Sequence, residues 1–328
     1  MNDFENKIKG VLKKEVEKPL SYDYAIKNAF YNSKNKRKSN LLLKLATTTS
    51  CLIMVCTGVF ATSYIVYEKV WKKPVIVNQE EENSNVEKEI SKEEKEKLPI
   101  IISFHGGGWI YGDKERYQYY CMSLAERGFA VINFTYRLAP EFKHPAPLED
   151  MNQVVHWIMN YAKDYFLDTE HIYGVGDSAG AHLLVLYASI LTNKEYASTY
   201  DFKVPEGFRF NALALNCGAY NITPELESTG ELMKEYLPNG GTEEEFKAIN
   251  PKQYITSDFP PCFVMTAEGD FLVEDALTMS QVLTHHNVPH IYKYYVGDKP
   301  LNHVFHCNIK LKEATQCNDE ECQFFRKY

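Results

Sequence analysis

The sequence predicts an α/β fold in which a mostly parallel sheet is covered by helices on both faces. From Leu98 onward, short and continuously apolar runs alternate with helix-length segments. Continuous apolar strands, without polar alternation, are typical of parallel strands buried on both faces. The expected strands are Pro99–Phe104, Phe129–Tyr136, Ile172–Val175, Asn211–Cys217, Cys262–Ala267 and His290–Val296. The expected helices are Tyr117–Arg127, Leu148–Tyr165, Ala181–Leu191 and Asp275–His286.

Three consecutive glycines follow the first of these strands, in His105-Gly-Gly-Gly-Trp109. Glycine lets backbone N–H groups point into a site that a side chain would block. No Gly-Lys-Ser/Thr follows, so a phosphate-binding loop is disfavoured. The position after a strand and before the first crossover helix is typical of an oxyanion-hole loop.

A serine between two glycines, in Gly176-Asp-Ser178-Ala-Gly180, follows the third predicted strand and precedes a helix. Small flanking residues allow a tight strand-to-helix turn that exposes the serine hydroxyl. The N-terminal N–H groups of the following helix then point toward any oxyanion formed there. The pattern predicts that Ser178 is a nucleophile.

Four motifs occur in order over about residues 98–310: His105-Gly-Gly-Gly-Trp, Tyr136-Arg-Leu-Ala-Pro-Glu, Pro145-Ala-Pro-Leu-Glu-Asp and Gly176-Asp-Ser-Ala-Gly. Together they resemble the hormone-sensitive-lipase-type carboxylesterases of the α/β-hydrolase superfamily. The resemblance implies an α/β-hydrolase fold, short to medium acyl esters as substrates, and no cofactor or metal. It also implies that Gly107, Gly108 and Ala179 supply the oxyanion N–H groups. His105, Arg137, Glu141 and Asp150 resemble structural supports of the loops.

In this superfamily the triad runs serine, acid, histidine along the chain. Asp270 follows the strand Cys262–Ala267 on a glycine turn and matches the Asp-x-Leu pattern of the family. Its alternatives are Glu268, Glu274 and Asp275.

His303 is the predicted base, because Asn302-His-Val-Phe305 resembles the His-Gly-Phe of the family, with Val304 in place of glycine. The alternative is His306. His285 and His286 end a predicted helix, and His290 begins a strand. His303 is expected to take the Ser178 proton while Asp270 holds the imidazole tautomer.

The charge of the chain is unevenly distributed. Residues 1–40 carry ten Lys/Arg and five Asp/Glu, a net charge of +5, so the −8 of the whole chain leaves −13 for the remainder. A basic leader before an acidic body favours a membrane rather than a nucleic acid as partner.

Leu45 to Tyr67 are uncharged and would span about 34 Å as a helix, enough to cross a bilayer. The basic leader favours a cytoplasmic N-terminus and an extracellular body, although three lysines follow the span. The alternative is a secretion signal that is cleaved near Phe60-Ala61. A leader of about forty residues is longer than the charged start of an ordinary signal peptide, which argues against this alternative.

These patterns divide the chain into a basic helical leader (1–40), a transmembrane helix (41–68), an acidic tether (69–97) and a catalytic domain (98–328) with a partial cap at 221–257. The family usually has two further strands before the first one found here. Either Val75–Val77 forms a reduced edge strand, or the strand Phe129–Tyr136 is exposed. In the C-terminal region, one pair among Cys307, Cys317 and Cys322 could form a disulfide if the body is extracellular.

The sequence thus favours a membrane-anchored serine esterase that acts on small or medium acyl esters. The alternative is a hydrolase-derived sensor or interaction domain of a membrane signalling protein. The missing leading strands and the helical leader are the features that favour this alternative.

Overall fold

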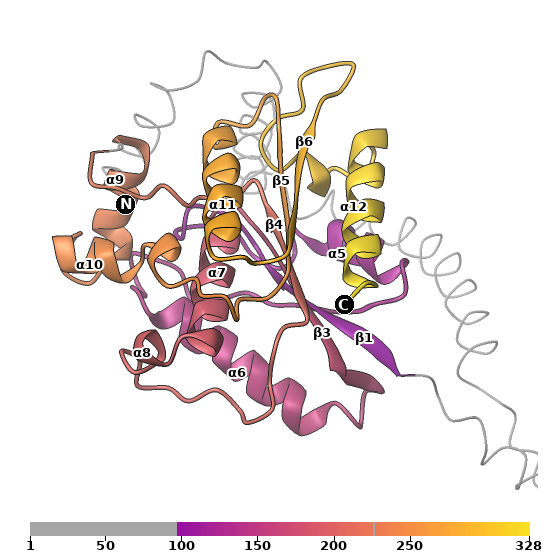
Figure 1. Ribbon diagram of the computed structural model, residues 1–328, viewed down its shortest axis with the longest axis horizontal. Coiled ribbons are helices and arrows are strands. Elements are labelled where there is room, and N and C mark those ends of the chain that lie inside the picture. Colours follow the sequence, from indigo (N-terminus) through magenta and orange to yellow (C-terminus); the bar gives the residue numbers. More distant parts are fainter. Residues whose placement is uncertain (1–96, 226) are drawn as a thin grey trace, which may run out of the picture. The chain divides into compact units, whose positions relative to one another are not determined.

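The computed structural model (Figure 1) describes residues 97–225 and 227–328. The chain divides into two compact units, Met1–Glu94 and Lys95–Tyr328, and the described residues belong to the second. The predicted leader and span, and the tether apart from Lys97, lie outside the described residues. Within the described ranges, no helix combines the length and apolarity that a bilayer crossing requires.

The described residues build one six-stranded sheet in the order β2-β1-β3-β4-β5-β6, and every neighbouring pair is parallel. Its strands are β1 (Leu98–Phe104), β2 (Ala130–Asn133), β3 (Leu167–Asp177), β4 (Ala212–Asn216), β5 (Cys262–Ala267) and β6 (His290–Tyr295). The predicted α/β fold with a parallel sheet is confirmed. Because all strands run in one direction, the loops after β1, β3 and β5 gather at one edge of the sheet.

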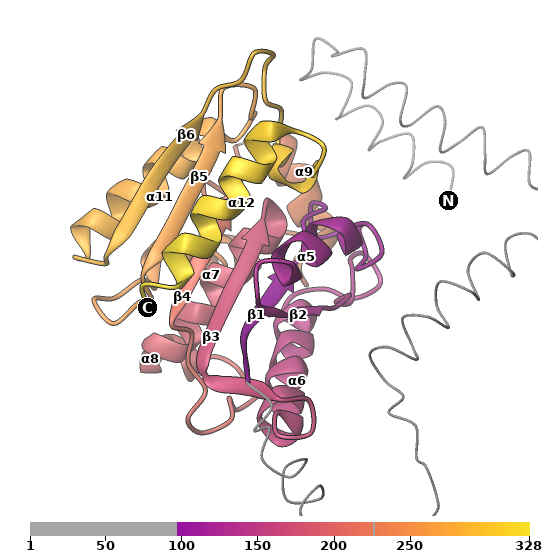
Figure 2. The same ribbon diagram turned by 90° about the vertical axis from the view of Figure 1, so that its right-hand side faces the viewer.

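Helices cover both faces of this sheet (Figures 1 and 2). The helices are α5 (Gln118–Ala125), α6 (Ala146–Tyr161), α7 (Ala179–Thr192), α8 (Lys194–Ala197), α9 (Glu227–Tyr236), α10 (Glu243–Ala248), α11 (Val273–His285) and α12 (Lys312–Phe325), with short 3₁₀ helices η1 (Pro251–Gln253) and η2 (Phe305–Cys307). Helix α12 has no counterpart among the elements expected from the sequence. Helices α9 and α10 lie within the region expected to form a partial cap.

Alternating side chains of β1 pack into two separate hydrophobic cores, one on each face of the sheet. Ile100 and Ile102 pack with the apolar sides of α6, α7 and α11, whereas Ile101 packs with residues of α5 and α12. Successive strand residues point to opposite faces, so a continuous apolar run supplies both cores. Figure 2 shows α5 and α12 together in front of the strands.

Two strands, β2 and β3, differ from the predicted bounds by more than two residues. Strand β2 ends at Asn133, not Tyr136, because the chain then turns to place the Tyr136 hydroxyl on the carbonyl oxygen of His105, at 2.8 Å. Strand β3 begins at Leu167, ahead of the predicted Ile172, and pairs with the start of β1 across a register shift at Pro99/Ile100. Both differences reflect contacts with distant segments.

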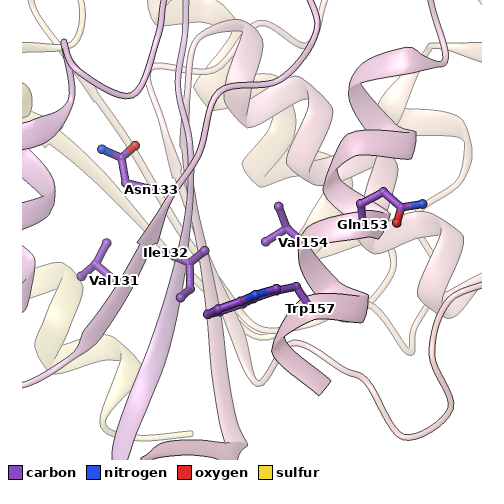
Figure 3. A pocket seen from close by; sticks show the side chains of 6 residues that line it. All are labelled: Val131, Ile132, Asn133, Gln153, Val154 and Trp157. Atoms are coloured by element: carbon purple, nitrogen blue, oxygen red, sulfur yellow. The ribbon is translucent and has the colours of Figure 1, made fainter. Parts of the chain in front are cut away.

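Among the described strands, β2 pairs only with β1 and therefore forms an edge of the sheet. A groove lies between this edge and α6, lined by Val131, Ile132, Asn133, Gln153, Val154 and Trp157 (Figure 3). Val75–Val77, the segment considered as a further edge strand, lies outside the described residues. None of the predicted catalytic residues lines this groove.

The cysteines of the described chain are free thiols. They are Cys121, Cys217, Cys262, Cys307, Cys317 and Cys322. The C-terminal disulfide that the sequence left possible is therefore absent from the described residues, and Cys317 and Cys322 of α12 instead pack in the apolar core.

Candidate active site

Ser178 lies on the turn between β3 and α7 in a backbone conformation that non-glycine residues rarely adopt, with φ 53° and ψ −123°. Three backbone bonds hold it there: its N–H donates to the Asn216 carbonyl at 3.1 Å, and its carbonyl accepts from the N–H groups of His182 and Ala219, each at 3.2 Å. Strain of this kind persists only where surrounding contacts enforce it and is frequent at catalytic turns. The turn has the geometry predicted for a nucleophile.

The first turn of α7 lies directly against the glycine loop that follows β1. A Cβ added to Gly180 would lie 2.6 Å from the carbonyl oxygen of His105, so only glycine permits this approach. Gly107 and Gly108 have φ values of 126° and 57°, and a Cβ on Gly107 would collide with the Tyr111 carbonyl. The packing therefore brings the loop with Gly107 and Gly108 beside the helix that begins at Ala179.

Asp270 and His303, which are 33 residues apart, are joined by a hydrogen bond of 2.7 Å between Asp270 Oδ1 and His303 Nδ1. Burial by itself would raise the pKa of Asp270. The bonds from His303, the Leu272 N–H and the Thr266 hydroxyl outweigh it, so the pKa lies below its ordinary value. An ionised carboxylate can only accept, so His303 Nδ1 carries the proton and Nε2 is left free to act as a base.

The end of β4 links this pair to Ser178. Asn216 accepts the Ser178 N–H, and the next residue, Cys217, has its Sγ within 4.8 Å of ligand atoms of both Asp270 and His303. The three residues predicted as a triad thus gather at the carboxyl edge of β3, β4 and β5, where the loops of a parallel sheet meet.

Two of the three alternative acids bind backbone N–H groups, and the alternative base, His306, lies in other surroundings; the Glu274 carboxylate forms no hydrogen bond within the described residues. Glu268 accepts from the Gly297 and Leu301 N–H groups. Asp275 accepts from the Tyr220 and Asn221 N–H groups at 2.6 and 2.8 Å. His306 is buried beside Tyr120 and Cys307.

Three of the four residues that resemble loop supports, His105, Arg137 and Asp150, form contacts of that kind, whereas Glu141 is exposed. His105 stacks on Tyr136 with ring centroids 4.1 Å apart, and its Nδ1 lies 2.8 Å from the Gly106 carbonyl oxygen. Arg137 donates to Asp150 at 2.8 Å and to Glu149 at 2.7 Å, which fastens the loop after β2 to the start of α6.

Two residues near the site were not singled out by the sequence analysis. The exposed ring of Phe271 lies 4.3 Å from the His303 ring. Leu232 of α9 approaches the glycine loop, since a Cβ on Gly108 would lie 3.3 Å from its Cδ1. Phe271 could have been predicted near the site, because it directly follows Asp270 in the sequence. The contact between Leu232 and Gly108 could not, because no sequence pattern connects the two residues.

Two groups of mixed ligand atoms in the described chain are close enough to hold a metal ion. One is Cys217, Asp270 and His303, in which the aspartate and histidine already bond each other. The other is Asp177, His306 and Cys307. The first arrangement suits proton transfer better than metal binding, because its histidine–carboxylate pair is complete without an ion.

A sheet of this order, a strained serine turn and an adjoining glycine loop are the features of an α/β-hydrolase. The family model BD-FAE matches residues 89–285, more than half of the chain. The chain belongs to this family. It is a carboxylesterase-like hydrolase of the hormone-sensitive-lipase type, as the four sequence motifs predicted.

Relatives of known name support the same assignment. An acetyl esterase of Salmonella schwarzengrund is 29% identical over 233 residues, which cover 69% of this chain and 71% of that protein. A versiconal hemiacetal acetate esterase of Dothistroma septosporum is 28% identical over 229 residues, 63% of this chain and 67% of that protein. Esterase B of Lactobacillus rhamnosis, solved with a tributyrin phosphonate inhibitor, superimposes with a TM-score of 0.64 at 26% identity, covering 70% of this chain and 76% of that one.

Proposed function

We propose that this family member hydrolyses short acyl esters through Ser178, Asp270 and His303, with the N–H groups of Gly107, Gly108 and Ala179 as oxyanion hole. The observation that carries the proposal is the 2.7 Å bond between Asp270 and His303 at the sheet edge that also holds the strained Ser178 turn. A paired, correctly protonated imidazole at the same sheet edge as a half-buried serine on a strained turn is the arrangement that acyl transfer requires.

In the first half of the reaction, His303 Nε2 removes the Ser178 proton as Oγ attacks the ester carbonyl carbon. The negative charge formed on the carbonyl oxygen is stabilised by the three backbone N–H groups. Asp270 stabilises the imidazolium without itself taking the proton. The imidazolium then protonates the alcohol as the ester C–O bond breaks, which leaves an acyl-Ser178.

Water completes the cycle by the same route. His303 takes a proton from water, whose oxygen attacks the acyl carbon, and returns it to Ser178 Oγ as the acyl–enzyme bond breaks. The products are one carboxylic acid and one alcohol for each water consumed. No step requires a cofactor or metal.

Short acyl groups suit the surroundings of the glycine loop. Leu232 lies close to Gly108, one of the proposed oxyanion glycines, and so limits the space beside it. Phe271, which is 70% exposed, places its ring against that of the proposed base His303. The acetate-releasing relatives and the tributyrin inhibitor of the solved relative agree with this size of acyl group.

The test is turnover of p-nitrophenyl acetate and butyrate by the purified full chain and by Ser178→Ala. Loss of the nucleophile is expected to lower kcat by at least about 10⁴-fold. Ser189→Ala is the matched control, because this buried serine lies on α7, the helix that follows Ser178, and its hydroxyl has no partner in the described chain. Equal turnover by Ser178→Ala and wild type would contradict the proposal.

A fluorophosphonate label separates an esterase from the alternative, a sensor or interaction domain of a membrane signalling protein. Labelling of Ser178 in the folded protein, absent in Asp270→Asn, supports an activated nucleophile. A folded chain that neither labels nor turns over the esters would favour the sensor.

The proposal includes a membrane anchor: residues 41–68 form one transmembrane helix, residues 1–40 are cytoplasmic and the catalytic body is extracellular. The net charge of +5 on the leader and the uncharged stretch Leu45 to Tyr67 support it, because Lys and Arg resist translocation. Protease added to intact cells should remove the body and spare an N-terminal tag. Survival of the body until lysis would indicate the reverse orientation, and a body free in the medium would indicate secretion.

A further inference from the structure

A second group of ligand atoms lies next to the Ser178 turn, since Asp177 directly precedes Ser178. One ligand atom each from Asp177, His306 and Cys307 lies within 4.8 Å of the others. Asp177 ends β3, whereas His306 and Cys307 belong to η2, so two distant segments supply the three atoms. Asp177 and His306 are buried, and neither has a role in the proposed reaction.

The spacing of these atoms matches one edge of a metal tetrahedron. With Zn–S near 2.3 Å and Zn–N near 2.05 Å, tetrahedral angles separate sulfur and nitrogen by about 3.6 Å. Cys307 Sγ and His306 Nε2 lie 3.4 Å apart. An ion can therefore be accommodated with small side-chain movements.

The protein leaves the His306 ring poorly satisfied. Its Nδ1 is buried without a hydrogen-bond partner in the described chain, and Nε2 has the weak thiol contact to Cys307. Buried polar atoms are normally paired, because an unpaired one costs about 1–3 kcal/mol. An ion coordinated at Nε2 would give that nitrogen a strong partner in place of the weak thiol contact, whereas Nδ1 would still lack one.

Asp177 is already oriented as a ligand by its neighbours. The Tyr117 hydroxyl donates to Asp177 Oδ2 at 2.7 Å and itself accepts the Gly106 N–H at 2.9 Å. Hydrogen bonds of this kind fix the direction of metal-ligating carboxylates. Cys307 is partly exposed and provides the route of entry.

We infer that Asp177, His306 and Cys307 form a site for a zinc-class divalent cation, separate from the catalytic group. The mixed O, N and S donor set favours Zn²⁺ or Co²⁺ over Mg²⁺ and Ca²⁺, which prefer oxygen ligands. On binding, the Cys307 thiol releases its proton to solvent and the thiolate forms the metal–sulfur bond. Carboxylate and thiolate then balance the 2+ charge, and solvent takes the fourth position. The site does not depend on the proposed esterase function.

The test is titration of the metal-free full chain with Co²⁺, followed by its displacement with Zn²⁺. All proteins carry Cys51→Ser and Cys56→Ser, which removes the thiols outside the described residues. One equivalent of Co²⁺ should produce thiolate charge-transfer absorption and the intense visible bands of tetrahedral cobalt. Zn²⁺ should abolish both signals and raise Tm.

Variants assign the signal to one of the two groups. Cys307→Ser should remove the charge-transfer band, and His306→Gln should weaken binding at least about tenfold. Cys217→Ser, in the catalytic group, is the matched control and should bind cobalt like the parent. Unchanged metal-free Tm and circular dichroism show that each variant folds. The inference would be overturned if the charge-transfer band persisted in Cys307→Ser, or if it were lost in Cys217→Ser alone. It would also be overturned if the parent protein did not bind one equivalent of Co²⁺.

Discussion

Trp109 Nε1 donates a hydrogen bond of 3.1 Å to Nδ1 of His182, and the two rings meet edge to face with centroids 5.4 Å apart. Because Nδ1 accepts, the proton of the neutral ring is on Nε2, which donates to the Ile249 carbonyl at 2.8 Å. Burial lowers the pKa of His182 to about 3, so the ring stays neutral at working pH. The imidazole of His182, on α7, is thus hydrogen-bonded both to the glycine loop, through Trp109, and to the segment after α10, through Ile249.

His182→Leu should destabilise the protein by about 2–4 kcal/mol, because it leaves the Trp109 N–H and the Ile249 carbonyl buried without partners. Urea unfolding measures the change. His156→Leu on α6 is the control: this half-buried ring contacts the Lys203 carbonyl by a solvent-exposed hydrogen bond, and its loss should cost less than about 1 kcal/mol. Equal effects of the two substitutions would show that the bridge contributes nothing.

Asp270→Asn should lower kcat on p-nitrophenyl acetate by about 10³–10⁴-fold with a smaller change in KM. The amide can donate to His303 Nδ1 and thereby stabilise the wrong imidazole tautomer. Glu268→Gln is the comparison, because Glu268 binds backbone N–H groups rather than His303. A larger loss of kcat in Glu268→Gln than in Asp270→Asn would transfer the role of the acid to Glu268.

Leu232→Ala should raise kcat/KM for p-nitrophenyl hexanoate relative to acetate by about 3–10-fold, because removing its side chain enlarges the space beside Gly108. The ratio of the two kcat/KM values, measured on the same preparation, is insensitive to the fraction of active enzyme. Leu277→Ala on the exposed side of α11 is the control. If the ratio of the two kcat/KM values did not change, the acyl chain would not bind beside Leu232.

Glu321 of α12 links that helix to the sheet: its carboxylate accepts from the Tyr120 hydroxyl at 3.0 Å and from Asn216 Nδ2 at 2.7 Å. Burial raises the pKa of Glu321 to about 7. The two hydrogen bonds and the charge of Arg127 lower this pKa, and the charge of Asp177 raises it further. The folded state therefore binds this proton more tightly than the unfolded state. Its stabilising contribution is complete below about pH 4.5 and is lost as the pH rises through about 7.

Glu321→Gln removes that titration, so the free energy of unfolding of the variant relative to wild type should rise by about 1–3 kcal/mol between pH 5 and pH 8.5. Urea unfolding at the two pH values measures it. Glu320→Gln is the control. Burial raises the pKa of Glu320, but the bond from Lys293 and its other partners outweigh burial and lower the pKa, so this group stays ionised over the range. A pH-independent difference for Glu321→Gln would contradict the argument.

Local patterns accounted for the sheet and the serine turn. Strand β5 has the predicted bounds Cys262–Ala267 because its six residues are all buried, as a continuous apolar run requires. Helix α12 was missed because its buried face includes Asn318 and Glu321, whose side chains pair only with distant residues. A polar residue on a buried helix face has no signature in local hydrophobicity.

The sequence by itself determined which residue types could perform the chemistry: the serine between glycines, the aspartate after β5 and the histidine after β6. Only the tertiary structure decided which partners they have. The Asp270–His303 bond joins residues 33 apart, and the Trp109–His182 bond joins residues 73 apart. Such contacts depend on the order of strands in the sheet and on helix packing. The same dependence applies to Asp177, His306 and Cys307, which come together because η2 packs against the end of β3.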